Sequence, residues 1–306
     1  MPTFTIMITT HNRCADLRRT CAVLASLSPR PDEVLICADG CTDDTVSMIV
    51  SEFPGFLVLE NSERQGSVAS RDRMLRLASA DIVISLDDDS YPVEVDFLAQ
   101  VGRVLEQHPE AAVISFAEIR DEGCGEQAAP SRDECRGRYV AAYANCGAAM
   151  RRDVYLQLAG FPRFFGHMYE ESDYALQCYA AGLAVWFEPS LAVRHHMSRV
   201  NRHVGRRQRL HARNELWSVW LRCPWPYLPA VASFRVWRQL RYAATQSLSD
   251  VLLQPAWWLS ALGGLPQCIA RRRPVARSKY LAWMMLARRP IYRQVELARA
   301  MGGTDE

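Results

Sequence analysis

The sequence predicts an α/β protein with a mostly parallel sheet and flanking helices, followed by a C-terminal helical region. Over the first half of the chain, short apolar runs rich in β-branched residues alternate with segments of helical periodicity. Such alternation is typical of parallel sheets with helical crossovers. Charge also divides the chain. Residues 1–190 hold 29 of the 34 acids and 16 of the 36 basic residues, which leaves 5 acids and 20 basic residues for 191–306.

Each expected element has its own signal. The apolar runs that predict strands are Phe4–Thr9, Glu33–Ala38, Phe56–Glu60, Ile82–Leu86 and Ala112–Phe116. Helices are expected between them near residues 14–27, 43–53, 66–79 and 93–108, the second capped by Thr42 or Asp43 and the fourth beginning at Pro92. Residues 120–137 are polar and aperiodic, which predicts a mobile loop. A strand at Gly147–Arg151 and a helix at Glu170–Gly182 follow.

Three consecutive aspartates, Asp87, Asp88 and Asp89, directly follow the fourth expected strand. Thr9 and Asp39 end two others, and ligands bind at the carboxyl ends of such strands. Adjacent carboxylates hinder one another's ionisation. A divalent cation would reverse that penalty and offer a diphosphate a binding point. A solvated acidic turn is the simpler alternative.

Further polar residues fit the same chemistry. Arg71 follows the turn Gln65–Ser67 that opens a helix, a position suited to a phosphate. Glu170, Glu171 and Asp173 form a second acidic cluster, where a partly desolvated carboxylate is able to act as general base toward a hydroxyl. His195 is able to supply a metal ligand. Ordinary structural roles, such as acids at a helix N-terminus, remain open for each.

Together these segments resemble the inverting nucleotide-sugar glycosyltransferases of family 2, which have the GT-A fold. The resemblance covers about residues 3–215. It rests on the order and spacing of TTHNR (9–13), EVLICADGCTDDT (33–45), RQGSVASRDRML (64–75), SLDDDS (85–90), CGAAMRRDVYLQLAGF (146–161), EESDYALQCYAAG (170–182) and PSLAVRHH (189–196). It implies a GT-A domain over residues 1–215, with a donor half at about 1–118 and an acceptor half at about 138–215. Residues 216–306 would form a basic, Trp-rich helical region.

The resemblance also implies roles for single residues. Those expected to bind the donor are Thr9, His11, Arg13, Asp39, Arg71, Asp87 and Asp88, of which Asp87 and Asp88 would lie near the ribose and the sugar. The expected ligands of Mn²⁺ or Mg²⁺ are Asp89, Asp87 and His195. Glu171 is the expected base, with Glu170 and Asp173 as alternatives.

The sequence departs from the family pattern at three positions. Ala38 stands where an acid is common, and the expected base is Glu171 where the family usually has aspartate. Gln177 and Cys178 stand where an arginine often follows the acidic motif. These departures leave the identity of the base open among the three acids.

The implied reaction transfers a hexosyl or deoxyhexosyl group, with inversion, from a UDP-, GDP- or dTDP-sugar to a glycan or lipid-linked acceptor. The product would be a surface polysaccharide or glycolipid. Two alternatives remain at this point. One is a sugar-nucleotide nucleotidyltransferase, which the absence of a Gly-rich, Lys-bearing phosphate loop near the first strand disfavours. The other is a catalytically silent nucleotide-binding or membrane scaffold protein.

The basic C-terminal region predicts contact with an anionic membrane surface. Arg235, Arg238 and Arg241 recur every three residues beside Trp237, a pattern typical of interfacial helices. The apolar stretch Val251–Leu265 is shorter than the roughly 20 residues that span a bilayer. Ten scattered cysteines without a CxxC pair and no visible signal peptide favour a cytoplasmic protein on the inner face of the membrane. Simple packing on the catalytic domain is the alternative, and no nucleic-acid motif accompanies the charge.

Overall fold

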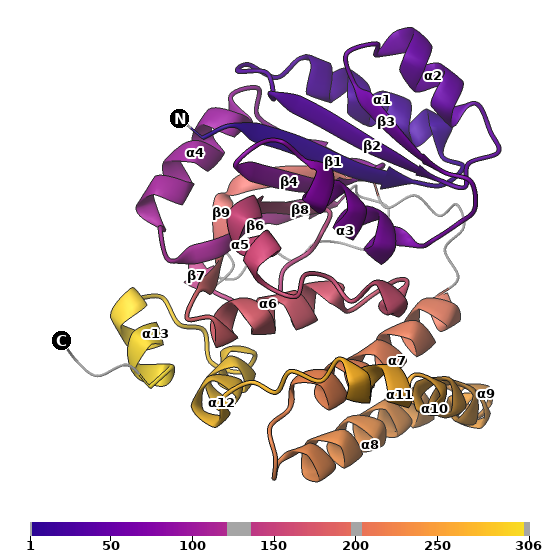
Figure 1. Cartoon of the computed structure of the whole chain (residues 1–306), viewed down its shortest axis with the longest axis vertical. Coiled ribbons are helices and arrows are strands. Elements are labelled where there is room, and N and C mark those ends of the chain that lie inside the picture. Colours follow the sequence, from indigo (N-terminus) through magenta and orange to yellow (C-terminus); the bar gives the residue numbers. More distant parts are fainter. Residues whose placement is uncertain (1, 121–135, 197–203, 303–306) are drawn as a thin grey trace.

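The computed structural model describes residues 2–120, 136–196 and 204–302. Within these residues the centre of the molecule is a nine-stranded sheet of order β3-β2-β1-β4-β8-β6-β9-β5, with β7 paired to β9 (Figure 1). Its strands are β1 (Phe4–Thr10), β2 (Glu33–Asp39), β3 (Leu57–Asn61), β4 (Ile82–Asp87), β5 (Ser90–Pro92), β6 (Ala111–Arg120), β7 (Arg138–Tyr139), β8 (Gly147–Arg151) and β9 (Ala184–His195). The loop expected at 120–137 lies, apart from its ends, outside the described residues.

The first four strands in the order, β3-β2-β1-β4, are all parallel. β1, β2 and β4 are buried along almost their whole length, as expected for parallel strands covered by helices on both faces. The edge strand β3 is only partly buried. The sequence prediction of an α/β fold with a mostly parallel sheet is confirmed.

The other half of the sheet is mixed. β8 runs antiparallel to both β4 and β6, whereas β9 is parallel to β6. The expected start of the fourth helix at Pro92 is wrong, because Ser90–Pro92 pair with β9 and the helix begins at Phe97. The ladder between β6 and β9 also slips, since Phe116 pairs with Glu188 but Ala117 pairs with Ala192.

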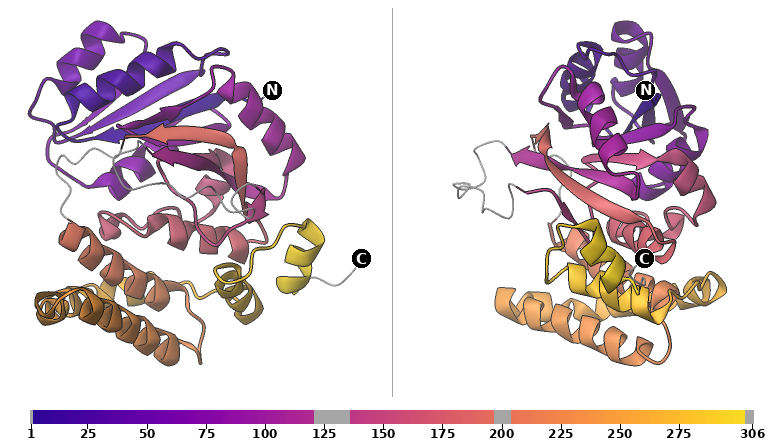
Figure 2. Two further views of the ribbon diagram at one scale, coloured as in Figure 1. Left: turned by 180° about the vertical axis from the view of Figure 1, so that it is seen from behind. Right: turned by 90° about the vertical axis from the view of Figure 1, so that its left-hand side faces the viewer.

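Helices cover both faces of the sheet (Figures 1 and 2). α1, α2 and α4 lie on one face, and α3, α5 and α6 on the other, with α7–α13 beyond α6. The helices are α1 (Cys14–Ala25), α2 (Thr45–Glu52), α3 (Ser67–Leu77), α4 (Phe97–Gln107), α5 (Arg152–Gln157), α6 (Glu170–Ala180), α7 (Val204–Arg222), α8 (Leu228–Gln246), α9 (Leu248–Leu252), α10 (Gln254–Gly263), α11 (Leu265–Ala270), α12 (Arg277–Leu286) and α13 (Gln294–Ala300), with a 3₁₀ turn at Arg163–Phe165.

The C-terminal helices share one core with the sheet. Trp217 and Trp283 belong to the same buried apolar cluster as Ile6 and Ile84. The boundary expected at residues 215/216 falls inside α7, which continues through it without a break. The C-terminal helices therefore pack on the α/β part of the protein.

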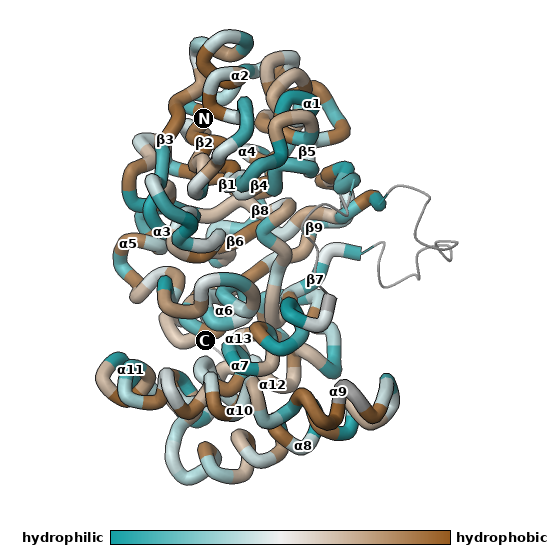
Figure 3. Tube along the Cα trace, turned by 90° about the vertical axis from the view of Figure 1, so that its right-hand side faces the viewer, coloured by the Kyte–Doolittle hydropathy of each residue, from teal (hydrophilic) through white to brown (hydrophobic). Residues whose placement is uncertain are grey.

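The membrane-facing arrangement expected for the C-terminal arginines differs from the one observed. Arg235 and Arg238 both pair with buried Glu215 of α7, at 3.1 and 2.5 Å. Apolar residues are exposed instead on α9 and α10, among them Leu248, Leu252, Leu259 and Leu262, and Figure 3 shows hydrophobic segments there. Within the ranges that the structure describes, every helix is too short or too polar to cross a bilayer.

Candidate active site

The carboxyl ends of three neighbouring parallel strands bring the expected donor-site residues to one edge of the sheet. β1 lies between β2 and β4, so that Thr9 pairs with Cys37 on one side and with Asp87 on the other. Asp39 is the last residue of β2 and Asp87 the last of β4. The order of the strands therefore gathers Thr9, Asp39 and Asp87 as the sequence predicted.

Asp39 is buried and holds the loop that leads into α3. Its Oδ1 accepts from the backbone N–H of Gln65 at 2.8 Å and from Asn61 Nδ2 at 2.9 Å, and its Oδ2 accepts from the backbone N–H of Gly66 at 2.8 Å. His11 Nδ1 lies 2.8 Å from the Asp39 carbonyl oxygen. Asp39 thus shapes this corner of the site, and its contact with a nucleotide base stays a prediction.

Arg13, in the turn after β1, lies between the second and third aspartates. Its Nη1 donates to Asp88 Oδ1 at 2.5 Å and its Nη2 to Asp89 Oδ2 at 2.7 Å. Burial raises the pKa of Asp88 to about 7, although Arg13 opposes the shift. Asp88 is buried against Arg13 and holds the guanidinium that in turn holds Asp89. The contact with the donor that was expected for Asp88 and for Arg13 stays a prediction.

Arg71, on α3, connects the aspartates to the second acidic cluster. Its buried guanidinium donates from Nη2 to Asp87 Oδ1, and its Nη1 lies 3.4 Å from Glu170 Oε1. Asn145 Nδ2 donates to the same Glu170 oxygen at 3.2 Å. One guanidinium therefore ties the end of β4 to the start of α6. Its expected position near a diphosphate stays a prediction.

The residues expected to bind a cation converge. β5 and β9 pair so that Ser90 lies opposite His195, which brings the imidazole to the aspartates. His195 Nε2 is 3.1 Å from Asp89 Oδ1 and 3.9 Å from Asp87 Oδ2, and the three residues offer ligand atoms within 4.8 Å of one another. The other oxygens of the two carboxylates face Arg71 and Arg13.

This donor set fits a divalent cation. The buried Nε2 of His195 faces both carboxylates and has no hydrogen bond of acceptable geometry to the described part of the chain, so a cation that replaced its proton would find this nitrogen directed at two carboxylate oxygens. Two carboxylate oxygens and one imidazole nitrogen suit Mn²⁺, and with added water or phosphate oxygens they suit Mg²⁺. Although burial alone would raise the pKa of Asp89, His195 and Arg13 hold it below its usual range. Asp89 is therefore an anion at neutral pH.

The three acids of α6 lie in different surroundings. Glu170 is buried between Arg71 and Asn145. Glu171 is half-buried and its carboxylate makes no hydrogen bond or ion pair with any residue that the structure describes. Burial, followed by the neighbouring charge of Glu170, raises the pKa of Glu171 to about 8. Among these acids, Glu171 has the carboxylate best able to accept a proton.

Asp173 is not placed to act as base. It is fully buried, and its carboxylate accepts from Ser218 Oγ at 2.8 Å and from Arg222 Nη2 at 2.9 Å. Gln177 Nε2 also donates to it, at 2.9 Å. These contacts fasten α7 to α6, so the alternative assignment of the base to Asp173 is abandoned. The family often has an arginine shortly after the acidic motif, where this chain has Gln177 and Cys178. Here Arg222 of α7 places a guanidinium beside that motif instead.

The turn before the two glutamates is strained and clamped. Met168 and Tyr169 both have positive φ, 77° and 74°, a conformation that is uncommon for such residues and recurs at functional sites. Buried Asn214 of α7 donates from Nδ2 to the carbonyl oxygens of His167 and Met168, each at 2.8 Å. α7 therefore fixes the turn that presents Glu170 and Glu171.

Sequence reasoning missed several residues that build this site. Glu118 contacts His195, Asn145 contacts Glu170, and Asn214 and Arg222 hold the start of α6. Only Glu118 carried a signal, because it follows an expected strand as the other acids do. The other three become visible only when α7 and the segment before β8 are placed in space.

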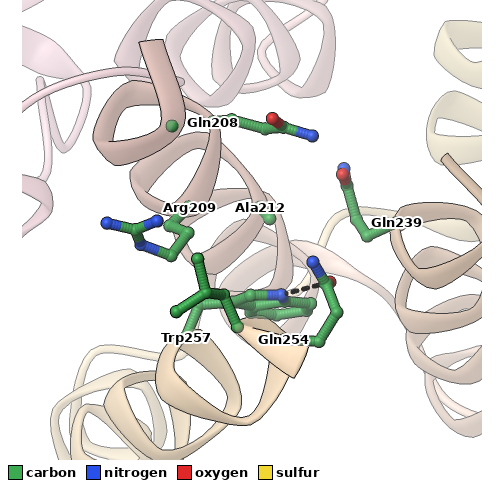
Figure 4. A pocket seen from close by; sticks show the side chains of 8 residues that line it. Gln208, Arg209, Ala212, Gln239, Gln254 and Trp257 are labelled. Atoms are coloured by element: carbon green, nitrogen blue, oxygen red, sulfur yellow. Dashed lines mark hydrogen bonds between the residues drawn. The ribbon is translucent and has the colours of Figure 1, made fainter. Parts of the chain in front are cut away.

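A small cavity lies elsewhere, between α7, α8 and α10 (Figure 4). Its lining residues include Gln208, Gln239, Gln254 and Trp257. With about 10 Å³ it has room for about one water molecule. It contains none of the acids described above and is a packing feature of the helical region.

The mixed sheet, with acids and a histidine at its strand ends, defines an α/β protein suited to hold a cation there. Residues 5–159, about half of the chain, match the profile of Glycosyl transferase family 2. The chain belongs to this family and is a glycosyltransferase. No curated protein matches the chain in sequence.

Solved structures share the fold. The mannosyltransferase PcManGT from Pyrobaculum calidifontis, in complex with GDP-Man and Mn²⁺, has a TM-score of 0.59 at 18% identity, over 98% of this chain and 86% of that one. S. aureus TarS 1-349, in complex with UDP-GlcNAc, has a TM-score of 0.60 at 15% identity, over 99% of this chain and 93% of that one. At such identities the likeness concerns the fold alone.

Proposed function

We propose that this glycosyltransferase is metal-dependent and inverting, and that it moves a sugar from a nucleotide-sugar donor to a hydroxyl group. The observation that carries the proposal is a set of contacts that runs from His195 to Glu170. His195 faces Asp87 and Asp89, and Arg71 joins Asp87 to Glu170. Glu171 follows Glu170 in the sequence, and the charges of Glu170, Arg71 and Asp87 act on its carboxyl group. This supports a cation site and an uncompensated carboxylate as parts of one site.

The donor side is held by the strand-end acids. Asp87, Asp89 and His195 are the residues that would hold Mn²⁺ or Mg²⁺, which when bound supplies positive charge for the diphosphate leaving group. Asp87 and Asp89 each keep one oxygen on an arginine, so their remaining oxygens are oriented before any ligand arrives. The donors in the similar solved structures, GDP-Man and UDP-GlcNAc, support a nucleotide-sugar here.

The acceptor side depends on Glu171. Its raised pKa makes it a stronger base than a solvated carboxylate. Glu171 takes the proton as the acceptor oxygen attacks the anomeric carbon from the face opposite the diphosphate. The carbon–oxygen bond to phosphate breaks, and its electron pair leaves with the nucleoside diphosphate. A single displacement inverts the anomeric centre, as in inverting glycosidases.

A panel of nucleotide-sugars tests the proposal. We expect one or more of the UDP-, GDP- or dTDP-sugars to release nucleoside diphosphate with Mn²⁺ or Mg²⁺, and EDTA to abolish the release. A nucleotidyltransferase would release no nucleoside diphosphate from the panel and would instead form pyrophosphate when given a nucleoside triphosphate and a sugar 1-phosphate. A silent nucleotide-binding protein would do neither. Release that is unaffected by EDTA would reject the metal while keeping the transfer, and a retained anomeric configuration in the product would reject inversion.

The acceptor is proposed to be a glycan or a lipid-linked sugar of surface polysaccharide or glycolipid synthesis, reached from the cytoplasmic face of the membrane. Exposed Leu248, Leu252 and Leu259 in a region rich in arginine support a peripheral contact with an anionic surface. Flotation with vesicles containing anionic lipid is expected to carry the protein upward. Protein that stays at the bottom of the gradient would contradict the membrane contact without affecting the proposed chemistry.

A further inference from the structure

Glu118, on β6, lies against the side of His195 that faces away from the aspartates. Its Oε1 is 2.5 Å from His195 Nδ1, and its Oε2 accepts from Arg120 Nη2 at 2.9 Å. His195 Nε2 faces Asp87 and Asp89. The imidazole is therefore held between one carboxylate on Nδ1 and two on Nε2.

A register slip in the sheet produces this arrangement. From Val113, which pairs with Val185, to Phe116, which pairs with Glu188, β6 and β9 run in one register, but Ala117 pairs with Ala192. Three residues of β9 are thus left out of the ladder. Because side chains alternate along a strand, an odd slip exchanges the faces that the following residues of β9 present. Such irregularities re-aim side chains beside active sites, and here the slip accompanies the contact between Glu118 and His195.

We propose that Glu118 is a positioning residue for the cation site: it accepts the Nδ1–H of His195, which fixes the ring and leaves the Nε2 lone pair directed at the cation between Asp87 and Asp89. The inference rests on the metal-dependent function proposed above. Metal-ligating histidines commonly give their second nitrogen to a carboxylate in this way. Buried Nε2, without a hydrogen bond of acceptable geometry to the described residues, supplies the free ligand atom.

A second grouping competes with this assignment. Glu118, Cys146 and His195 also offer atoms within 4.8 Å of one another. For His195 to serve that group through Nδ1, the nitrogen would have to give up Glu118 as its hydrogen-bond acceptor. The 2.5 Å contact between Glu118 Oε1 and His195 Nδ1 therefore favours Glu118 as a hydrogen-bond acceptor over Glu118 as a ligand.

Mn²⁺ binding to the full chain, measured by electron paramagnetic resonance of free Mn²⁺, tests the proposal without turnover. Glu118→Ala is expected to weaken Mn²⁺ binding by about 10–100-fold. Glu118→Gln keeps an acceptor oxygen and is expected to recover part of the loss. Glu110→Ala is the matched control, because Glu110 also contacts a histidine, His108 Nδ1 at 3.2 Å, away from the acids. It is expected to bind Mn²⁺ as the wild type does.

A double-mutant cycle separates positioning from general loss of structure. Once His195→Ala has removed the ring, adding Glu118→Ala is expected to weaken Mn²⁺ binding no further. Losses that add in full would overturn the proposal, as would wild-type affinity in Glu118→Ala. Two bound Mn²⁺ ions per chain that fall to one in Glu118→Ala would also overturn it, because Glu118 would then be a ligand. A wild-type chain that binds no Mn²⁺ would instead reject the metal-dependent function itself.

Discussion

The acids at the strand ends and the acids of α6 show two ways in which a fold treats buried negative charge. Asp89 keeps Arg13 and His195 beside it, and Asp87 keeps Arg71. On α6, by contrast, Asp173 is fully compensated by Arg222, whereas Glu171 has no bonded partner among the described residues. Carboxylates paired with a cation are fixed in position and are suited to hold ligands or helices. The uncompensated one retains its proton affinity, which is the property a base requires.

The largest effect is expected from removing that uncompensated carboxylate. Glu171→Gln preserves the size of the side chain but cannot accept the acceptor's proton, so turnover is expected to fall by about 10²–10⁴-fold. Donor binding is expected to be unchanged, because the strand-end acids are untouched. Steady-state kinetics and calorimetry with the nucleotide-sugar measure the two quantities.

Glu171→Asp is the matched control for that change. It retains a carboxylate but withdraws it by one methylene, so its turnover is expected to lie between those of the wild type and Glu171→Gln. Near-normal turnover in Glu171→Gln would contradict the assignment of the base, and Glu170→Gln would then be the variant to measure.

The ion pair between Asp173 of the same helix and Arg222 of α7 is expected to affect stability instead of chemistry. Arg222→Met leaves Asp173 buried without its cation, and breaking a buried pair in this way destabilises a protein by about 3–5 kcal/mol. Urea unfolding measures the loss of free energy. Turnover per folded molecule is expected to remain close to that of the wild type.

Removing both charges sharpens this test. In Asp173→Asn combined with Arg222→Met no charge is left buried, so the double variant is expected to be more stable than Arg222→Met alone. If turnover of the folded double variant fell by orders of magnitude, Asp173 would have to be considered as the base again. The contrast between Asp173 and Glu171 would then be wrong.

On the donor side of the proposed site, replacing Asp89 is expected to weaken the binding of the metal. Asp89→Asn removes the charge of a proposed metal ligand. Mn²⁺ affinity is expected to weaken by at least about tenfold, because replacing even a residue that only orients a ligand costs about that much affinity. Calorimetric titration with Mn²⁺ measures the change. Asp81→Asn, beyond the other end of β4, is the control, because the Asp81 carboxylate accepts hydrogen bonds from Thr3 and lies far along the strand from Asp89. Equal affinities in the two variants would count against Asp89 as a ligand.

The sequence predicted the strands of about the first 118 residues well because their signals are local. Strands such as Ile82–Asp87 are short, apolar and followed at once by their polar residues, so strand identity and site position are readable together. The convergence of Thr9, Asp39 and Asp87 follows from parallel pairing alone. His195 was placed correctly beside the acids by its spacing in the family pattern.

The contacts of α6 and β9 could not be predicted in the same way because their partners are distant in sequence. Arg222 meets Asp173 across 49 positions, and Glu118 meets His195 across 77. Both depend on features that no local pattern encodes: the docking of α7 on α6, and the slip between β6 and β9. The ion pairs of Arg235 and Arg238 with Glu215 could not be read from the sequence for a related reason, since they join α8 to α7.

The smallest expected effect is on the pH dependence of stability. It tests directly whether the Glu171 carboxyl group lacks a compensating partner. Burial and Glu170 raise its pKa from 4.5 to about 8, so between these pH values the folded chain holds a proton that the unfolded chain has lost. Stability is therefore expected to fall as pH rises from about 5 to 8. Glu171→Gln removes this contribution and is expected to be more stable than the wild type at pH 8, by on the order of 1 kcal/mol, with no difference at pH 5. Thermal unfolding at both pH values measures it.

Loss of the Glu171 proton is expected to change stability and turnover in opposite directions. Glu171 accepts the acceptor's proton only when it is ionised, so turnover is expected to rise through the pH range in which stability falls. Glu171→Asp keeps an ionisable group and is expected to retain both trends, whereas Glu171→Gln is expected to lose both. If Glu171→Gln had the same stability profile as the wild type from pH 5 to 8, Glu171 would be an ordinary solvated acid, and its contrast with Asp89 and Asp173 would lose its physical basis.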